Sequence, residues 1–382
     1  MLDAVDDART LDLLRRLVET PSANPPGNEA DVAGVLADAF EREGIAARLE
    51  EVRSGRPNVS AELGPAGGPT LLLNGHTDTM PPGEGWASDP YAAVVTDGRL
   101  YGLGACDMKA GLAAMTEAVI AVRRSCIPLR GGVYLDAVVD EEATGSGTKH
   151  TVAGGRRADF AIVAEPTGLE VLRLGNGQVN FQVRFHGTAG HGSTPESGHN
   201  AIYDAAALVA LLEAEAARLA SEPYPLIGPA TYNVGRIDGG LRTSIVPAEC
   251  VVGVDRRIVP GQNVREAVAD LDAVLARLAA DRPGCRTERT IDIEYEAFEV
   301  PEDLPGCRVL RAAAEEASGR TIGFGGLRAT TDAVFLAEGG TPTVVFGPGS
   351  IEQAHGPDEF VPIDELHQCV RALALTIVRL LA

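Results

Sequence analysis

Apolar residues recur along the first part of the chain in two different spacings. Residues 8–20 and 29–44 carry them at helical spacing, so each segment predicts an amphipathic helix. Short apolar runs predict buried strands, and an alanine-rich segment predicts another helix. The expected strands are 58–63, 70–74, 133–139 and 160–164, and the expected alanine-rich helix is 108–122. Strands that alternate with helices predict an α/β fold with a mainly parallel sheet.

The pattern changes near Gly175, where the order of expected elements becomes β-α-β-β-α-β, the split βαβ arrangement. Its strands are expected at 179–185, 231–237, 249–255 and 290–296, and its helices at 201–219 and 264–280. The first pattern then resumes with a helix after Pro305, a strand at 343–346 and a helix at 363–381. We therefore predict a catalytic domain in two segments, 1–175 and 299–382, around an inserted ferredoxin-like domain at 176–298.

Composition narrows the possible partners and the compartment. The chain has 382 residues, 45% of them hydrophobic, which is typical of globular domains with substantial cores. A formal net charge of -21 argues against nucleic acid and membrane surfaces as partners. The N-terminal residues lack a basic segment followed by an apolar run, and no stretch approaches the roughly 20 apolar residues of a membrane span. Six cysteines without a CxxC pair predict buried free thiols, so a cytoplasmic protein is expected.

Polar residues with catalytic potential follow the predicted strands or begin the alanine-rich helix. In an open α/β sheet, sites form at the carboxyl ends of strands, and these residues fit that position. Histidines and carboxylates in this combination suit divalent metals, zinc above all. For any one residue a structural role is the simpler explanation, but five such segments together point to a metal centre. The segments are centred on His76 and Asp78, on Asp107, on Asp140–Glu142, on Glu165 and on His355.

Two adjacent glutamates allow a division of roles. Neighbouring side chains in Asp140–Glu142 cannot all point the same way, so one glutamate can bind metal while another accepts a proton from water. One carboxylate can also bridge two ions about 3.5–4 Å apart, as in two-metal hydrolases. The residues therefore predict hydrolysis by a metal-activated water.

The motifs G-H-x-D, G-x-x-D-M-K, D-E-E, A-E-P-T and Q-A-H-x-P-D-E together give the chain a specific resemblance. It resembles the M20 family of metallopeptidases and deacylases, and within it the acetylornithine deacetylase and succinyl-diaminopimelate desuccinylase branch. The resemblance covers essentially the whole chain. It implies that His76 and Glu165 hold one metal ion, that Glu142 and His355 hold another, and that Asp107 bridges them. Zinc is the expected metal, with cobalt and manganese as alternatives.

The resemblance also implies roles outside the metal ligands. Glu141 would be the general base, and Asp78 would orient the metal-binding histidine beside it. The inserted domain would form a homodimer and act as a lid, with His191 reaching the partner's active site. Arg257 is a candidate clamp for a substrate carboxylate, with an ordinary ion pair as its alternative. Ser244 stands where the family often has a substrate-binding asparagine.

Several functions remain open at this point. The leading hypothesis is a deacylase of N-acyl amino acids. A dipeptidase or carboxypeptidase, or a hydrolase of N-carbamoyl amino acids, would use the same metals and base. A catalytically dead binding protein would be expected to lack a ligand or the base, and this sequence has them all.

Overall fold

The computed structural model describes all 382 residues, and they divide into two compact units. Unit 1 comprises Met1–Arg173, Val300–Gly325 and Thr331–Ala382. Unit 2 comprises Leu174–Glu299 and Gly326–Thr330. No helix is both long enough and apolar enough to span a membrane.

The main sheet is mixed, not mainly parallel as the sequence predicted. Its strands follow the order β1-β2-β6-β3-β7-β17-β8-β15, and β16 (Phe324–Leu327) pairs with β8. The four central strands are parallel: β6 (Gly132–Val138), β3 (Thr70–His76), β7 (Phe160–Val163) and β17 (Thr343–Val345). Antiparallel pairs flank them: β1 (Ala47–Arg53) with β2 (Arg56–Leu63), β2 with β6, and β8 (Val171–Gly175) with β15 (Phe298–Glu299) and β17. The sequence predicted no strand at β1, and the two-residue connection between β1 and β2 allows only an antiparallel hairpin.

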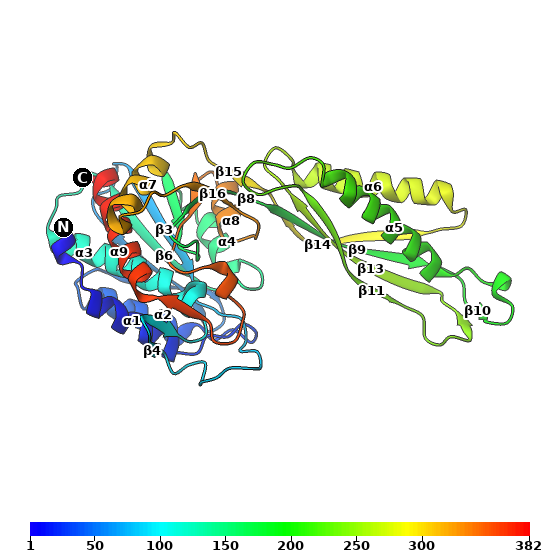
Figure 1. Cartoon of the computed structure of the whole chain (residues 1–382), viewed down its shortest axis with the longest axis horizontal. Coiled ribbons are helices and arrows are strands. Elements are labelled where there is room, and N and C mark those ends of the chain that lie inside the picture. The colour runs from blue at the N-terminus through cyan, green and yellow to red at the C-terminus, as the bar shows by residue number, and fades with distance from the viewer. The chain divides into compact units, whose positions relative to one another are not determined.

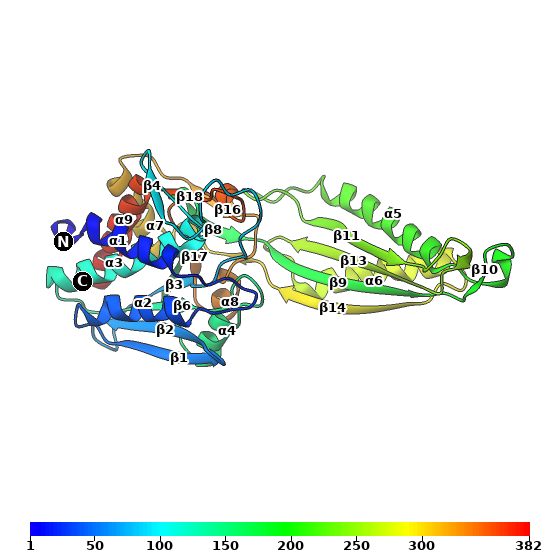
Figure 2. The same cartoon turned by 90° about the horizontal axis from the view of Figure 1, so that it is seen from below.

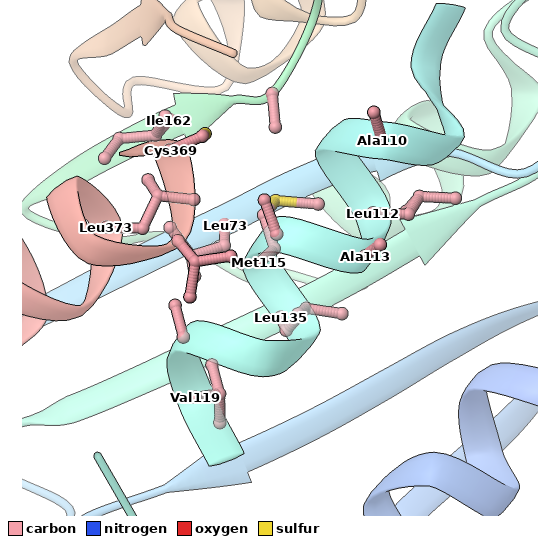
Figure 3. Close-up of a cluster of buried hydrophobic side chains, with 14 of the residues drawn as sticks. Leu73, Ala110, Leu112, Ala113, Met115, Val119, Leu135, Ile162, Cys369 and Leu373 are labelled. Carbon is pink, nitrogen blue, oxygen red and sulfur yellow. The ribbon is translucent and has the colours of Figure 1, made fainter. Parts of the chain in front are cut away.

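Helices cover both faces of the central strands (Figure 1). On one face Met115 of α3 and Leu373 of α9 pack near Leu73 of β3, in the buried cluster of Figure 3. Successive strand residues point to opposite faces, so the next residue, Asn74, turns away and donates a hydrogen bond to Thr148 of α4. The helices of unit 1 are α1 (Asp7–Glu19), α2 (Ala30–Glu41), α3 (Ala110–Ser125), α4 (Ser146–Ala153), α7 (Pro305–Ser318), α8 (Ala333–Glu338) and α9 (Ile363–Leu381).

The alanine-rich helix begins two residues later than predicted. Residues Ala105–Lys109 form a kinked turn in which Asp107 (φ -113°, ψ 98°) and Met108 (φ -127°, ψ 36°) leave the helical conformation. Beside this turn lies a small sheet that the sequence did not predict, in the order β18 (Phe360–Pro362), β5 (Arg99–Tyr101) and β4 (Val94–Thr96). The kink places Asp107 outside the regular helix.

Unit 2 has the predicted order of strands and helices. It runs β9 (Gly177–His186), α5 (Ala201–Leu219), β11 (Thr231–Gly239), β13 (Glu249–Ile258), α6 (Val264–Asp281) and β14 (Thr287–Tyr295). All strand pairs in its sheet β11-β13-β9-β14 are antiparallel. Alternate residues of β9, among them Phe181 and Phe185, are buried in a core shared with α5 and α6, whereas the residues between them are only partly covered. A short pair, β10 (Gly190–His191) and β12 (Ile245–Val246), lies at one end of this unit (Figure 2).

All six cysteines are free thiols. Four are buried, as expected, whereas Cys126 is exposed and Cys285 is partly exposed. The short loops that carry these two residues, after α3 and α6, leave them nearer the surface.

Candidate metal centre

The parallel strands of unit 1 bring most of the candidate residues to one edge of the sheet. The four central strands share a direction, so the residues that follow their carboxyl ends converge. The kinked turn Ala105–Lys109 adds Asp107 to the same place. The converging residues are His76 at the end of β3, Asp140–Glu142 shortly after β6, Glu165 two residues after β7, and His355 in the loop after β17.

Asp107 lies between two histidine–glutamate pairs. Its Oδ1 is 3.0 Å from Nε2 of His76, and its Oδ2 is 3.3 Å from Nε2 of His355. The same nitrogen of His76 is 3.5 Å from Oε1 of Glu165. The same nitrogen of His355 is 3.2 Å from Oε2 of Glu142. Each oxygen of the Asp107 carboxylate therefore faces its own histidine, and each of these two histidine nitrogens is also close to a glutamate.

Glu141 lies beside this arrangement. A ligand atom of Glu141 lies within 4.8 Å of ligand atoms of both His76 and Glu165. Glu142, its neighbour, forms a second such group with His76 and Asp107. The side chains of Glu141 and Glu142 thus lie close to different sets of residues, which agrees with the opposite directions expected for neighbouring side chains.

Crowding and burial shift the pKa values of the clustered side chains. Burial raises the pKa of Glu141 well above its usual range. Burial and the nearby Asp107 do the same for Glu165. Hydrogen bonds with Asp107 and Glu142 raise the pKa of His355 to about 10. None of the ion pairs made by Asp107, Glu142 or Glu165 involves arginine or lysine. Four crowded carboxylates with two imidazole nitrogens are a donor set that fits two divalent cations.

Asp78 contacts both His76 and the loop that carries the two glutamates. Nδ1 of His76 is 2.9 Å from the backbone carbonyl of Asp78 and 3.7 Å from its carboxylate. The carboxylate instead accepts the backbone N–H groups of Glu141 and Glu142, each at 3.2 Å, and the side-chain amide of Asn24 at 2.9 Å. Asp78 therefore links the histidine to the backbone of both glutamates.

Asp140 anchors the loop that carries the two glutamates. It is buried and adopts a left-handed backbone conformation (φ 68°), which is uncommon outside glycine. Its carboxylate accepts a hydrogen bond from Asn24 at 2.9 Å and lies 3.1 Å from Nη1 of Arg56. Arg56 also binds the buried carboxylate of Glu29. The side chain of Asp140 thus contacts Asn24 and Arg56 and fixes the loop.

Sequence reasoning gave no role to Asn24 or to Glu359. Asn24 donates to both Asp78 and Asp140 from a proline-rich loop that showed no catalytic pattern. Glu359 is buried and accepts three backbone N–H groups from the turn that carries Asp107. The only available signal for Glu359 was its place at the end of the Q-A-H-x-P-D-E motif.

The remaining candidates belong to unit 2 and are not all together. His191 in β10 pairs with Ile245, and the carbonyl of Ser244 accepts the N–H of Gly192 at 2.8 Å, so His191 and Ser244 are neighbours. Both are exposed. Arg257 lies near the opposite end of β13 from Glu249, eight residues further along the strand. A strand rises about 3.3 Å per residue, so Arg257 is roughly 25 Å or more from the His191 end.

Arg257 has local partners. Its Nε and Nη2 donate to the two oxygens of Asp255 at 2.8 and 3.0 Å, and its Nη1 donates to Thr330 at 3.2 Å. This is the ion pair that the sequence left open as an alternative to a substrate clamp. The adjacent Arg256 is buried on the other face of the strand, over the ring of Tyr232. The Arg257 guanidinium would have to exchange Asp255 for a substrate carboxylate in order to act as a clamp.

Comparisons with known proteins show the family of this chain and its fold. Residues 72–379 match the model of peptidase family M20/M25/M40. An acetylornithine deacetylase of Proteus mirabilis is 33% identical over 363 residues, covering 92% of this chain and 91% of the relative. The solved structure of aminopeptidase PepT from Bacillus cereus is similar with a TM-score of 0.83 at 23% identity, covering 99% of each chain. A dinuclear metal-binding peptidase from Bacillus subtilis is similar with a TM-score of 0.73 at 18% identity, covering 98% of this chain and 99% of that one.

Proposed function

This chain belongs to peptidase family M20/M25/M40, a family of metal-dependent hydrolases of amide bonds, and from that premise we propose that it deacylates N-acyl amino acids. The proposal uses two metal ions and one glutamate base in unit 1. The relative from Proteus mirabilis, an acetylornithine deacetylase at 33% identity, supports this substrate class.

One observation carries the proposal: the two oxygens of Asp107 face two separate histidine–glutamate pairs. One metal ion would be held by His76 and Glu165, and the other by His355 and Glu142, with Asp107 shared between them. Zinc suits this mixture of nitrogen and oxygen ligands, and cobalt or manganese are alternatives. When bound, the ions would polarise the scissile carbonyl and lower the pKa of a water molecule.

Glu141 would perform the proton transfers. Its carboxylate lies close to His76 and Glu165. Each of the two histidines already has another glutamate beside it, so Glu141 is free for proton transfer. Its carboxylate would take a proton from the attacking water and then deliver it to the leaving amine nitrogen. Asp78 would hold Glu141 in place, because its carboxylate accepts the Glu141 N–H.

Substrate recognition would come from unit 2. Arg257 presents a planar fork that matches a carboxylate in two-point fashion, and the protein carries a net charge of -21. An anionic substrate therefore needs a local positive group. Ser244, beside His191, would reach whichever substrate His191 reaches.

We assign His191 to the active site of a partner subunit. Arg257 and His191 lie at opposite ends of the sheet in unit 2, and a small N-acyl amino acid cannot span that distance. In a symmetric dimer, one subunit's Arg257 and the other subunit's His191 can share one substrate. The edge strand β11 and neighbouring exposed apolar residues offer a dimer surface, with Tyr203 65%, Ile237 49% and Leu241 90% exposed.

A peptidase is the second candidate, because the fold is shared with an aminopeptidase and with a dinuclear metal-binding peptidase. A panel of N-acetyl, N-succinyl, N-formyl and N-carbamoyl amino acids together with dipeptides, assayed with added zinc or cobalt, separates the candidates. Turnover of the N-acyl amino acids above the dipeptides supports deacylation. Preferred cleavage of dipeptides or of carbamoyl substrates would contradict deacylation and assign a peptidase or a carbamoyl hydrolase instead. A metal-loaded protein that cleaves none of the substrates would favour a binding protein.

A further inference from the structure

The carboxylate of Glu359 fills the turn that presents Asp107. Its Oε1 accepts the backbone N–H groups of Cys106 at 2.8 Å and Asp107 at 3.0 Å, and its Oε2 accepts that of Gly104 at 3.0 Å. The side chain is 2% exposed, so no water competes for these donors. One carboxylate thus satisfies three N–H groups of the kinked turn, in which Asp107 and Met108 leave the helical conformation.

The backbone of Glu359 is tied to the same turn. Its carbonyl accepts the N–H of Gly102 at 3.0 Å. The residues after it form β18, which pairs with β5, the strand just before the turn. Hydrogen bonds thus join the segment around Glu359 to the chain from β5 to Asp107, and they hold the two segments side by side.

The Glu359 segment also carries His355, four residues earlier. His355 faces Oδ2 of Asp107 at 3.3 Å and is itself held in a left-handed backbone conformation (φ 60°). A second tie joins the same two loops, because the Cys106 thiol donates to the carbonyl of Ser350 at 3.3 Å. The loops that bring His355 and Asp107 together are thus joined through Glu359.

We infer that Glu359 is a positioning residue for the metal centre, acting through the backbone of Asp107. By holding the N–H of Asp107, it sets the direction of that carboxylate, so that one oxygen faces His76 and the other faces His355. This inference rests on the proposed function, since it gives the orientation of Asp107 a purpose in metal binding. Partners that orient metal ligands typically change metal affinity or activity by about 10–100-fold when they are removed.

Two substitutions of Glu359 remove different numbers of hydrogen-bond acceptors from the three N–H groups. Glu359→Ala leaves three buried N–H groups without an acceptor, so we expect a large fall in the unfolding midpoint. Glu359→Gln keeps one oxygen for Cys106 and Asp107 but sets an amide N–H₂ against the N–H of Gly104. Glu359→Gln is therefore the milder variant, and it remains informative if Glu359→Ala does not fold.

The matched control is Glu117→Gln. Glu117 is a buried glutamate of α3 that accepts the N–H of Asp6 at 3.0 Å and the side chain of Arg9. None of its hydrogen bonds reaches the metal centre. Glu117→Gln therefore measures how much stability is lost when a buried, hydrogen-bonded carboxylate is removed elsewhere in unit 1.

The experiment measures zinc dissociation constants by chelator competition, the visible spectrum of the cobalt-loaded protein, and kcat and KM. We expect Glu359→Gln to weaken zinc binding by about 10–100-fold and change the cobalt spectrum, with kcat falling more than KM rises. Glu117→Gln should lower only the unfolding midpoint. Wild-type zinc affinity and cobalt spectrum in Glu359→Gln, even with lowered stability, would overturn the inference.

The same measurements separate this inference from the proposed function. If the wild-type chain binds metal and hydrolyses none of the substrates, the proposed function fails and the affinity contrast still decides the role of Glu359. If the wild-type chain binds no divalent ion, both are overturned.

Discussion

The candidate metal centre of unit 1 and the sheet of unit 2 both contain many carboxylates. They differ in the groups that pair with these carboxylates. In unit 2 several charged side chains form opposite pairs, such as the half-buried Arg257 with Asp255 and the exposed Arg184 with Glu249. In unit 1 Asp107 and Glu165 are buried among other carboxylates and histidines, without arginine or lysine. These pairs of unit 2 have their partners within the chain, whereas the carboxylates of the cluster have only His76 and His355 as positive partners.

This contrast distinguishes a functional cluster from ordinary surface pairing. An exposed ion pair contributes about 0–1 kcal/mol and carries little information about function. Burial and the nearby Asp107 raise the pKa of Glu165, whereas hydrogen bonds with His355 and His76 outweigh burial and lower the pKa of Asp107. Such an arrangement is retained at a cost in stability, which points to a role in chemistry.

The largest expected effect comes from Glu141→Gln. The amide cannot accept a proton from water, so kcat should fall by about 10²–10⁴-fold while metal content stays unchanged. Turnover measured together with metal analysis tests this. The matched control is Glu142→Gln, which should lose metal because Glu142 pairs with His355. Loss of metal in Glu141→Gln instead would mean that the roles of the two glutamates are exchanged.

A smaller effect is expected from Arg257→Ala, and it tests whether unit 2 recognises substrate. Losing a hydrogen bond to a charged group costs about 1.5–3 kcal/mol, so kcat/KM should drop by roughly 10²-fold for a substrate with a free α-carboxylate. Its methyl ester should be affected much less. Arg184→Ala, on the same sheet, should change neither, because Arg184 forms an exposed ion pair with Glu249. Equal losses on acid and ester would leave Arg257 as a structural partner of Asp255.

Mixing two inactive variants should restore part of the activity. Hybrid dimers of His191→Ala and Glu141→Gln would each contain one site with both groups intact, if His191 acts across the subunit interface. Activity of purified hybrids, compared with each homodimer, measures the effect. Hybrids that stay as inactive as the parents would show that His191 does not act in the partner's site.

The smallest effect concerns stability in unit 2. Burial raises the pKa of Asp204, but hydrogen bonds from His199 and Arg282 outweigh it and lower that pKa below its usual range. The stabilisation is therefore present above the unfolded pKa of about 4 and is lost as the pH falls through the lower folded value. Asp204→Asn should cost about 1.5–3 kcal/mol at pH 7, with the difference from wild type narrowing below pH 4. Urea unfolding across this range measures it.

The exposed pair of Asp238 and Arg236 is the control for that prediction. Asp238→Asn should cost less than about 1 kcal/mol at every pH, since exposed pairs contribute little. A pH-independent cost for Asp204→Asn would contradict the role given to its charge.

Much of the fold followed from the sequence because its strands and helices have strong hydrophobic patterns. The buried strand predicted at 70–74 is β3, which extends two residues further to His76, and the β-α-β-β-α-β order of unit 2 was predicted correctly. The antiparallel flanks were not, because pairing direction depends on connections between segments that hydrophobic patterns do not describe. The prediction that put the alanine-rich helix at 108 missed the kinked turn, which is held by Glu359, 252 residues from Asp107.

The candidate site was predictable where motifs follow strands, and less so where support comes from distant segments. His76 and His355 converge because they follow parallel strands, and the kinked turn Ala105–Lys109 adds Asp107. Asn24 and Glu359 act through hydrogen bonds to residues far along the chain. No local spacing encodes such contacts, so only the three-dimensional structure reveals them.

The most direct test of two cations held around Asp107 is the metal content of the wild-type protein and of His355→Ala. Both are loaded with zinc, freed of excess ion and analysed alongside activity. Two ions per wild-type chain are expected, because two histidine–glutamate pairs flank the carboxylate. His355→Ala should retain one ion and lose activity. A His355→Ala protein that keeps two ions and full activity would contradict the account.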